Sequence, residues 1–148
     1  MADPAPISVS RLDPSVSLPA HQTAGSAGFD LAASRDVTIP PGQIALVPTG
    51  LVIAVPTGHF LGIFARSSTP LKRGLVVANG VGVVDSDYCG PADEVKIQVL
   101  NVTGAPVTVS RGDRIAQGVI IPFVRVTFVE REAEPALPSR GGFGSTGS

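Results

Sequence analysis

The chain has 148 residues, enough for one domain, and carries a formal net charge of −1. It contains no Trp, six Phe and one Tyr, so its core must consist mainly of aliphatic side chains. No basic run is longer than two residues, which argues against a sequence-independent grip on nucleic acid.

Short runs rich in β-branched residues, separated by Pro and Gly, predict strands along most of the chain. One helical turn is expected in "SSTPLKRG" (67–74), where Ser68 or Thr69 can cap a helix with Pro70 at its first position. With 14 Pro and 17 Gly, this pattern favours an all-β sandwich or barrel. The predicted strands are residues 7–12, 37–39, 44–47, 51–55, 60–65, 94–101, 106–109 and 124–129.

The composition shifts towards Pro, Gly, Ser and Thr from Ala133 onward, which predicts a β domain over 1–132 and a flexible Gly-rich arm over 133–148. The N-terminus shows no secretory signal, and no apolar run reaches the length of a membrane span. Cys89 is the single cysteine, so an intrachain disulfide is excluded. We therefore expect a soluble cytoplasmic protein that binds neither nucleic acid nor membrane.

Five segments place polar residues among the apolar runs. The third of them is expected to form a hairpin. Taken alone, each has an ordinary structural explanation: Asp30 can satisfy backbone donors in a loop, Arg66 can belong to a surface turn, and Asp85 to another turn. The segments are "AGFDLAAS" (27–34), "FARSSTP" (64–70), "NGVGVVDSDYCG" (79–90), "RGDRIAQG" (111–118) and "SRGGFGSTGS" (139–148).

Common nucleotide and adhesion motifs do not account for these segments. "GVGVVD" lacks the third Gly and the following helix of a dinucleotide fingerprint, and "GGFGSTG" lacks the Lys of a phosphate loop. The tripeptide "RGD" would suggest cell adhesion, but nothing in the sequence indicates export. His21, His59 and Cys89 are isolated, which argues against a zinc site.

Taken together, the five segments describe a ligand. Arg66 and Arg140, with hydroxyl groups and glycine N–H groups, are the donors that a polyphosphate needs. Carboxylates at Asp30 and Asp85 suit a hydrated Mg²⁺ and a water to be activated. Tyr88 and Phe143 offer flat faces for a sugar and a base. A nucleoside triphosphate fits this set.

In this order, the five segments resemble the motifs of the homotrimeric dUTPase family. Asp85 follows Asn79 by six positions and Tyr88 follows three further on, as in that family; the resemblance covers about residues 24 to 147. It implies a compact jelly-roll-like (β-clip) barrel of short, mostly antiparallel strands. It also implies a homotrimer with shared active sites and Mg²⁺-dependent hydrolysis of dUTP to dUMP and pyrophosphate, which limits uracil in DNA and supplies dUMP for thymidylate synthesis.

The resemblance also implies roles for single residues. Asp85 would orient and deprotonate the attacking water, and Asp30 would hold a water of the Mg²⁺. Asn79 and the main chain near Val84 would pair with uracil, and Tyr88 would exclude a ribose 2′-OH. The expected substrate-binding residues are Arg66, Ser67, Ser68, Asn79, Val84, Tyr88, Lys96, Gln117, Arg140, Phe143, Gly144, Ser145 and Thr146. The last five belong to the arm, which would close over a site between subunits.

One stretch departs from the family pattern. The residues after Tyr88 are "CGPADEVK", where the family commonly has Arg-Gly-Glu, so about three extra residues precede Glu94. Three other functions are considered. The related dCTP deaminases carry a glutamate inside the strand that corresponds to "EVKIQVLN", which this chain lacks. A non-catalytic nucleotide sensor would not need Asp85 or the arm, and a purely structural β-sandwich leaves the clustered Arg, Asp and Gly unexplained.

Overall fold

The protein is described by a computed structural model over residues 6–133 and 138–143. Within these residues the chain forms short strands and one helical turn, so the all-β prediction is confirmed. In chain order the elements are β1 Ser8–Arg11, β2 Phe29–Ala32, β3 Val37–Ile39, β4 Ile44–Pro48, β5 Leu51–Ala54, β6 His59–Ala65, η1 Thr69–Arg73, β7 Leu75–Val77, β8 Gly82–Val84, β9 Lys96–Asn101, β10 Val107–Val109 and β11 Arg114–Pro122.

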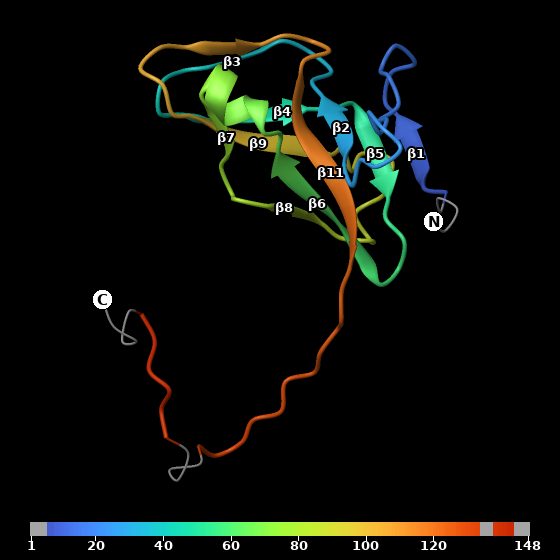
Figure 1. Cartoon of the computed structure of the whole chain (residues 1–148). Coiled ribbons are helices and arrows are strands. Elements are labelled where there is room, and N and C mark those ends of the chain that lie inside the picture. The colour runs from blue at the N-terminus through green and yellow to red at the C-terminus, as the bar shows by residue number, and fades with distance from the viewer. Residues whose placement is uncertain (1–5, 134–137, 144–148) are drawn as a thin grey trace.

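The strands form four small sheets, and neighbouring strands are antiparallel throughout. The largest sheet has the order β2-β11-β6-β8, and a three-stranded sheet has the order β4-β9-β7. Two pairs, β1-β5 and β3-β10, complete the body (Figure 1). Strand β11 lies in the middle of the largest sheet, so it holds β2 and β6 on either side.

The core between the sheets is aliphatic, as the absence of Trp predicts. Leu31, Leu61, Ile97 and Ile115 are each 0% exposed. Asn101 is also fully buried, but its amide nitrogen donates to the carbonyl oxygens of Ile39 at 2.9 Å and of Ala105 at 2.8 Å. Its polar groups are therefore satisfied, as burial in a low dielectric requires.

The helical turn η1 begins after Ser68 and ends at Gly74, whose φ of 64° lies in the left-handed region. The helical prediction is therefore confirmed, with Pro70 in the first turn. Ser68 occupies the N-cap position, as predicted, but its side chain makes no capping hydrogen bond with the described residues. The buried Thr69 hydroxyl instead donates to the Ile115 carbonyl at 2.8 Å, which attaches the turn to β11.

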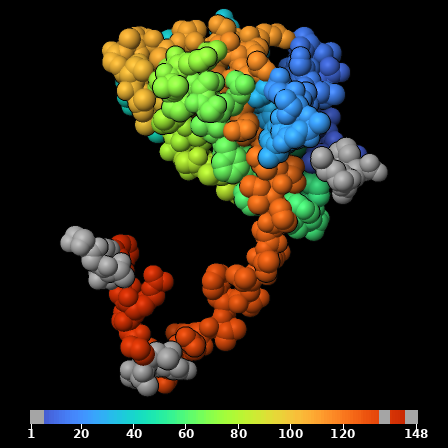
Figure 2. All heavy atoms as spheres, in the orientation of Figure 1, coloured from blue at the N-terminus to red at the C-terminus, as the bar shows by residue number. Residues whose placement is uncertain are grey.

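The predicted strand over residues 124–129 is wrong. Phe123 N still donates to the Gly58 carbonyl at 3.0 Å, but beyond it the chain extends away from the body (Figures 1 and 2). Val124 is 86% exposed and Phe128 is 93% exposed. An alternating apolar pattern cannot form a strand without a neighbour to receive its backbone hydrogen bonds.

Four observed strands, β2, β7, β8 and β11, are absent from the list of predicted strands, and β7 and β8 do not pair with each other as the expected hairpin requires. Strand β7 pairs with β9 and strand β8 pairs with β6, so the turn between β7 and β8 connects two sheets. The turn is closed by Gly80 N, which donates to the Val77 carbonyl at 3.0 Å, and Gly80 has a φ of 73°. Over the described ranges, we find no helix with the length and apolarity needed to cross a membrane.

Candidate active site

The polar residues of three neighbouring strands meet near the beginning of β11. Gln117 on β11 lies opposite Asp30 on β2, while Arg66 directly follows β6. The Asp30 carboxylate accepts from Arg66 Nε at 2.8 Å and from Arg114 Nη1 at 3.0 Å. We call Asp30, Arg66, Arg114 and Gln117 the arginine cluster. Its carboxylate is only 11% exposed, so these pairs are partly shielded from water.

The arginine cluster is also held by main-chain contacts. Arg66 Nη1 donates to the Arg114 carbonyl at 3.1 Å, and Gln117 Nε2 donates to the Ala65 carbonyl at 3.1 Å. A Cβ on Gly28 would lie 2.8 Å from Gln117 Oε1, so a larger residue there would require the amide to shift. A guanidinium has five N–H donors, and these contacts use two of them on Arg66. The side chain is therefore fixed in place with donors left for a ligand.

A polar hollow of about 350 Å³ lies beside the arginine cluster. Ser68 is half-buried at this hollow, and Ser67 next to it is exposed. The hollow contains four cationic side chains and one carboxylate, which suits an anionic ligand. Its lining residues are Arg66, Ser68, Lys72, Arg73, Gly112, Asp113 and Arg114.

The carboxylate of this hollow belongs to Asp113. Arg73 Nη1 donates to Asp113 Oδ2 at 2.7 Å, and Ser110 N donates to the same oxygen at 2.9 Å. The hydrogen bond from Arg73 is the main reason why the pKa of Asp113 lies below its ordinary value of 3.8; burial opposes it, and the Ser110 bond and the Arg73 charge add to it. Asp113 therefore stays ionised at neutral pH and keeps Arg73 in place.

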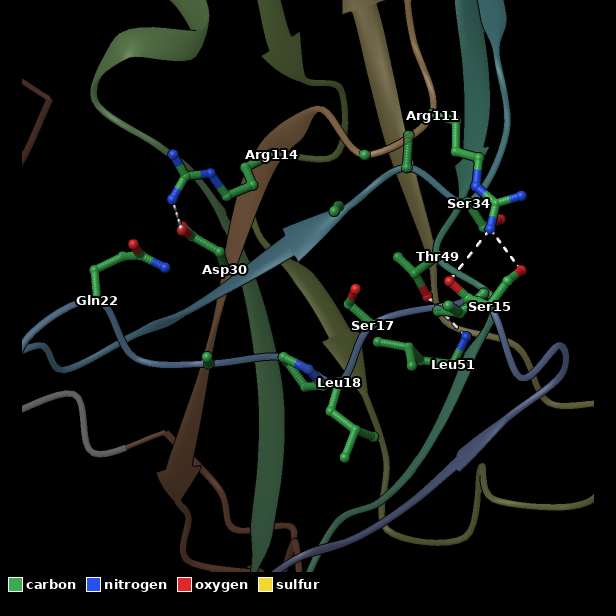
Figure 3. Close-up of a pocket in the computed structure, with 16 residues that line it drawn as sticks. Ser15, Ser17, Leu18, Gln22, Asp30, Ser34, Thr49, Leu51, Arg111 and Arg114 are labelled. Carbon is green, nitrogen blue, oxygen red and sulfur yellow. Dashed lines mark hydrogen bonds and ion pairs between the residues drawn. The ribbon is translucent and has the colours of Figure 1, made fainter.

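A second hollow, of about 280 Å³, adjoins Asp30 under the loop that precedes β2 (Figure 3). At one end, Arg114 pairs with Asp30 and the Gln22 side chain is directed towards them. At the other end, Arg111 Nη2 donates to Ser15 Oγ at 2.6 Å. The loop is therefore held over β2 by an arginine of the same "RGDR" stretch that supplies Arg114.

The third predicted segment covers the turn before β8, the strand itself and the loop that follows it. Val84 is half-buried on β8, while Asn79 and Asp85 are exposed. The Tyr88 ring is exposed by 41%, and its hydroxyl donates to the Glu94 carbonyl at 3.1 Å. Lys96 Nζ lies 3.9 Å from the Glu94 carboxylate. We call Asn79, Val84, Asp85, Tyr88 and Lys96 the turn group.

Asp85 and Arg66 lie near opposite ends of β6, whereas Asn79 precedes Gly82, which pairs with Ile63 towards the Arg66 end. Val84 pairs with Leu61 at the beginning of β6, whereas Arg66 follows its last residue, Ala65. Asp85 is therefore opposite a position six residues before Arg66, which corresponds to roughly 20 Å at ~3.3 Å per strand residue. One copy of the chain does not bring the proposed base and the proposed phosphate ligands together.

The predicted arm residues lie apart from both groups. Arg140 and Phe143 are exposed, and the segment that carries them is well away from the body in Figure 2. Gly141 and Phe143 have positive φ values, 75° and 50°. Gly144, Ser145 and Thr146 lie outside the described residues, so their predicted roles remain predictions.

The sequence reasoning did not single out several residues that the structure places around Arg66. Arg114, Lys72, Arg73 and Asp113 all line the same hollow. Their signal was the dense charge of "RGDR" just before the buried Ile115, and the adjacent pair "KR" at the end of the helical turn. The contacts between these two stretches depend on β6 and β11 being neighbours, which the sequence analysis did not predict.

The carboxylates near the hollow are engaged by arginines. Among the described residues, no group of three or more His, Cys, Asp or Glu side chains is placed to hold a metal ion. Asp30 faces two guanidinium groups, so it is better suited to a water of a hydrated ion than to direct coordination. This donor set fits Mg²⁺ that arrives on phosphates and keeps several waters.

The comparisons with known proteins agree on one family. The family model described as dUTPase matches residues 15–147. A deoxyuridine 5′-triphosphate nucleotidohydrolase of Desulfitobacterium hafniense is 46% identical over 93% of this chain and 91% of its own length. The enzyme of the same name from Methylocella silvestris is 41% identical over 100% of this chain and 95% of its own.

Solved structures show the same fold. The dUTPase of Streptococcus mutans matches with a TM-score of 0.71 and 40% identity, covering 75% of this chain and 89% of the other. A dUTPase of Staphylococcus bacteriophage 80alpha, solved with dUPNHPP, matches with a TM-score of 0.84 over 97% and 99% of the two chains; at 23% identity it shares the fold. From the family model and these near full-length relatives, the chain belongs to the dUTPase family.

Proposed function

We propose that the protein hydrolyses dUTP to dUMP and pyrophosphate. The observation that carries this proposal is the preorganised Arg66, held by Asp30 and by the Arg114 carbonyl at the edge of a cation-lined hollow. Such a site binds polyphosphate. Relatives at 41% and 46% identity over nearly the whole chain are named for this substrate, which identifies the nucleoside.

We infer that the working enzyme is a homotrimer with shared active sites. The separation of Asp85 and Arg66 along β6, roughly 20 Å at ~3.3 Å per strand residue, supports an arrangement in which different copies supply the base and the phosphate ligands to one substrate. The exposed segment after Phe123 supports self-association. Val124, Val126 and Phe128 alternate along it and are 86%, 61% and 93% exposed. A neighbouring copy can cover these side chains and remove their apolar surface from water.

In the proposed reaction, Asp85 orients a water and accepts its proton as the oxygen attacks the α-phosphorus. The bond to the bridging oxygen breaks, and pyrophosphate leaves. Arg66, Ser67, Ser68 and Gln117 bind the phosphates and stabilise the charge that develops on them, which supplies most of the catalysis in phosphoryl transfer. Mg²⁺ would neutralise charge on the triphosphate oxygens, with one of its waters held by Asp30.

Selection of the nucleoside belongs to the turn group in this proposal. Asn79 and the main chain near Val84 pair with the uracil edge, because a mismatched base would leave buried polar groups unpaired. Tyr88 packs on the deoxyribose where a 2′-OH would clash, and Lys96 on β9 is a further substrate-binding residue. The arm, residues 133–148, closes over the site: Arg140 binds the γ-phosphate, Phe143 stacks on uracil, and Gly144, Ser145 and Thr146 add donors.

The proposed reaction limits uracil incorporation into DNA and supplies dUMP for thymidylate synthesis. We place the protein in the cytoplasm, where the free, exposed thiol of Cys89 would stay reduced.

Product analysis with Mg²⁺ and separate dUTP, dCTP, dTTP and UTP tests the chemistry. Conversion of dUTP alone to dUMP and pyrophosphate is expected. Formation of dUTP or dUMP from dCTP would assign the chain to the deaminases, and binding of dUTP without turnover would make it a sensor. Sedimentation of the same sample tests the assembly, and a monomer with full activity would contradict the shared site.

A further inference from the structure

The cation-lined hollow contains one cationic side chain, that of Lys72, for which residues 6–133 and 138–143 provide no hydrogen-bonding or ionic partner. Arg66 and Arg114 pair with Asp30, and Arg73 pairs with Asp113. Lys72 also lines the hollow, yet its side chain makes no hydrogen bond or ion pair with any residue that the structure describes. Asp30 and Asp113 pair with the arginines, and no described carboxylate pairs with the Lys72 ammonium.

Contacts made by neighbouring residues of η1 hold the main chain of Lys72 in place. It belongs to η1, which is attached to β11 by the Thr69 hydroxyl on the Ile115 carbonyl at 2.8 Å. The next residue, Arg73, is attached to Asp113 at 2.7 Å. The main chain of η1 therefore presents Lys72 to the hollow in a defined place, while its long side chain stays free to move.

An exposed lysine of this kind is either a solvated side chain without a ligand or a side chain that binds one. A solvated lysine with no ligand is common, and such a residue contributes little to stability or binding. Lys72, however, shares its hollow with Arg66 and Ser68, which face the phosphates in the proposed function. An unpaired ammonium on a flexible stem suits a phosphate group whose position changes during a reaction, whereas a forked guanidinium suits a fixed one.

We propose that Lys72 is a further substrate-binding residue that contacts the pyrophosphate end of dUTP and the pyrophosphate released from it. This inference rests on the proposed function and names one more residue of the same site. Asp113 acts as a positioning residue, because it fixes Arg73 and with it the end of the turn that carries Lys72.

Calorimetric titration of the full-length protein with inorganic pyrophosphate and, separately, dUMP, both with Mg²⁺, tests the proposal. In Lys72→Gln, the Kd for pyrophosphate is expected to rise roughly fivefold, as for an exposed charge pair at the upper end of its usual range. The Kd for dUMP should not change, since dUMP lacks the two terminal phosphates. The KM for dUTP should rise with the Kd for pyrophosphate.

Two variants serve as controls. Lys72→Arg keeps the charge and should bind pyrophosphate within about twofold of the wild type, consistent with a loss caused by charge rather than shape. Arg35→Gln removes one exposed charge from the turn between β2 and β3, outside the residues that line the hollow, and should change neither constant.

An unchanged Kd for pyrophosphate in Lys72→Gln would overturn the proposal, and so would an equal loss for dUMP and pyrophosphate. Absence of any pyrophosphate binding by the wild type would overturn it too. A different result would contradict the proposed function alone. If the wild type binds pyrophosphate through Lys72 but does not hydrolyse dUTP, the anion site stands and the assigned reaction is wrong.

Discussion

Asp30 Oδ1 lies 2.8 Å from Arg66 Nε, although strand β11 runs between β2, which carries Asp30, and β6, which ends just before Arg66. The pair therefore joins β2 to the end of β6 across the centre of the largest sheet. Arg114, on β11 itself, donates to the other carboxylate oxygen at 3.0 Å. One carboxylate thus sets the positions of two guanidinium groups that line the cationic hollow.

Asp30→Asn should weaken this arrangement without removing a group that we expect to react. The amide cannot balance two guanidinium charges, so Arg66 will lose its fixed orientation. We expect kcat/KM for dUTP to fall by about 10- to 100-fold, as for misplaced substrate-positioning groups. Loss of a partly buried pair should lower the free energy of unfolding by about 2 kcal/mol. Steady-state kinetics and urea unfolding measure the two effects, and unchanged kcat/KM would contradict the role of the pair.

Asp85→Asn tests the proposed base, and Asp87→Asn is its matched control. Both residues are exposed, and they lie two positions apart after β8. The asparagine at position 85 cannot accept a proton from water, so turnover should fall by roughly 10²- to 10⁴-fold while dUTP still binds. Asp87→Asn should keep nearly full turnover. Comparable losses in both variants would show a general effect of charge in this loop and no specific base.

The sequence predicted much of the fold because its signals are local. Pro and Gly mark the ends of the runs at 37–39, 44–47 and 51–55, and each of these became a strand. The sequence analysis failed where pairing with another strand decides whether a segment forms a strand. "VRVTFV" has strand periodicity but no partner within the described chain, whereas β11 contains Arg114, Gln117 and Gly118 and still forms a strand between β2 and β6.

The candidate site, like the fold, could be predicted only in part. Residue type groups Asp30 with Arg66, and the family resemblance adds Gln117; the structure brings these three together. Asp85 was grouped with them too, but strand pairing puts it near the other end of β6. Pairing between strands also decides which further residues surround Arg66, so the sequence analysis did not identify Arg114 or the Arg73–Asp113 pair.

Tyr88→Phe tests how the longer loop after Tyr88 is used. The Tyr88 hydroxyl donates to the Glu94 carbonyl at 3.1 Å, and the Glu94 carboxylate accepts from Gly50 N at 2.8 Å. The loop thereby attaches the ring to the body. Without the hydroxyl the ring can move. The preference for dUTP over UTP should therefore fall by about fivefold, which corresponds to the loss of one hydrogen bond of about 1 kcal/mol.

The ratio of kcat/KM for dUTP to that for UTP measures this preference. Phe60→Leu, which changes an aromatic residue that contacts Phe123 at a ring-centroid distance of 6.5 Å, should leave the ratio unchanged. An unchanged ratio in Tyr88→Phe would mean that packing alone holds the ring.

Asp113→Asn should show a loss of stability that depends on pH. The pKa of Asp113 is lowered in the folded protein, chiefly by the hydrogen bond from Arg73, so its contribution is present above the unfolded value of 3.8. That contribution is lost as the pH falls through the lower folded value. At pH 7 the variant should be less stable by about 1 kcal/mol, and the difference should shrink below about pH 4. Urea unfolding at a fixed protein concentration across this range measures it; a difference that grows on acidification would contradict the assignment.

Truncation after Ser139 tests whether the C-terminal segment belongs to the site. Arg140 and Phe143 are exposed, and Phe143 has a positive φ of 50°, a backbone conformation that is uncommon for a non-glycine residue. We expect kcat/KM for dUTP to fall by at least about 100-fold, because an arm that closes over the site excludes water and completes the binding groups. The midpoint of thermal unfolding should change little, since the described residues among those removed, 140–143, are exposed. Phe143→Ala at full length should lose affinity for dUTP while it retains that for pyrophosphate, which separates stacking on the base from closure. Normal hydrolysis by the truncated protein would show that the first four segments suffice, and that the phosphates are bound by the body alone.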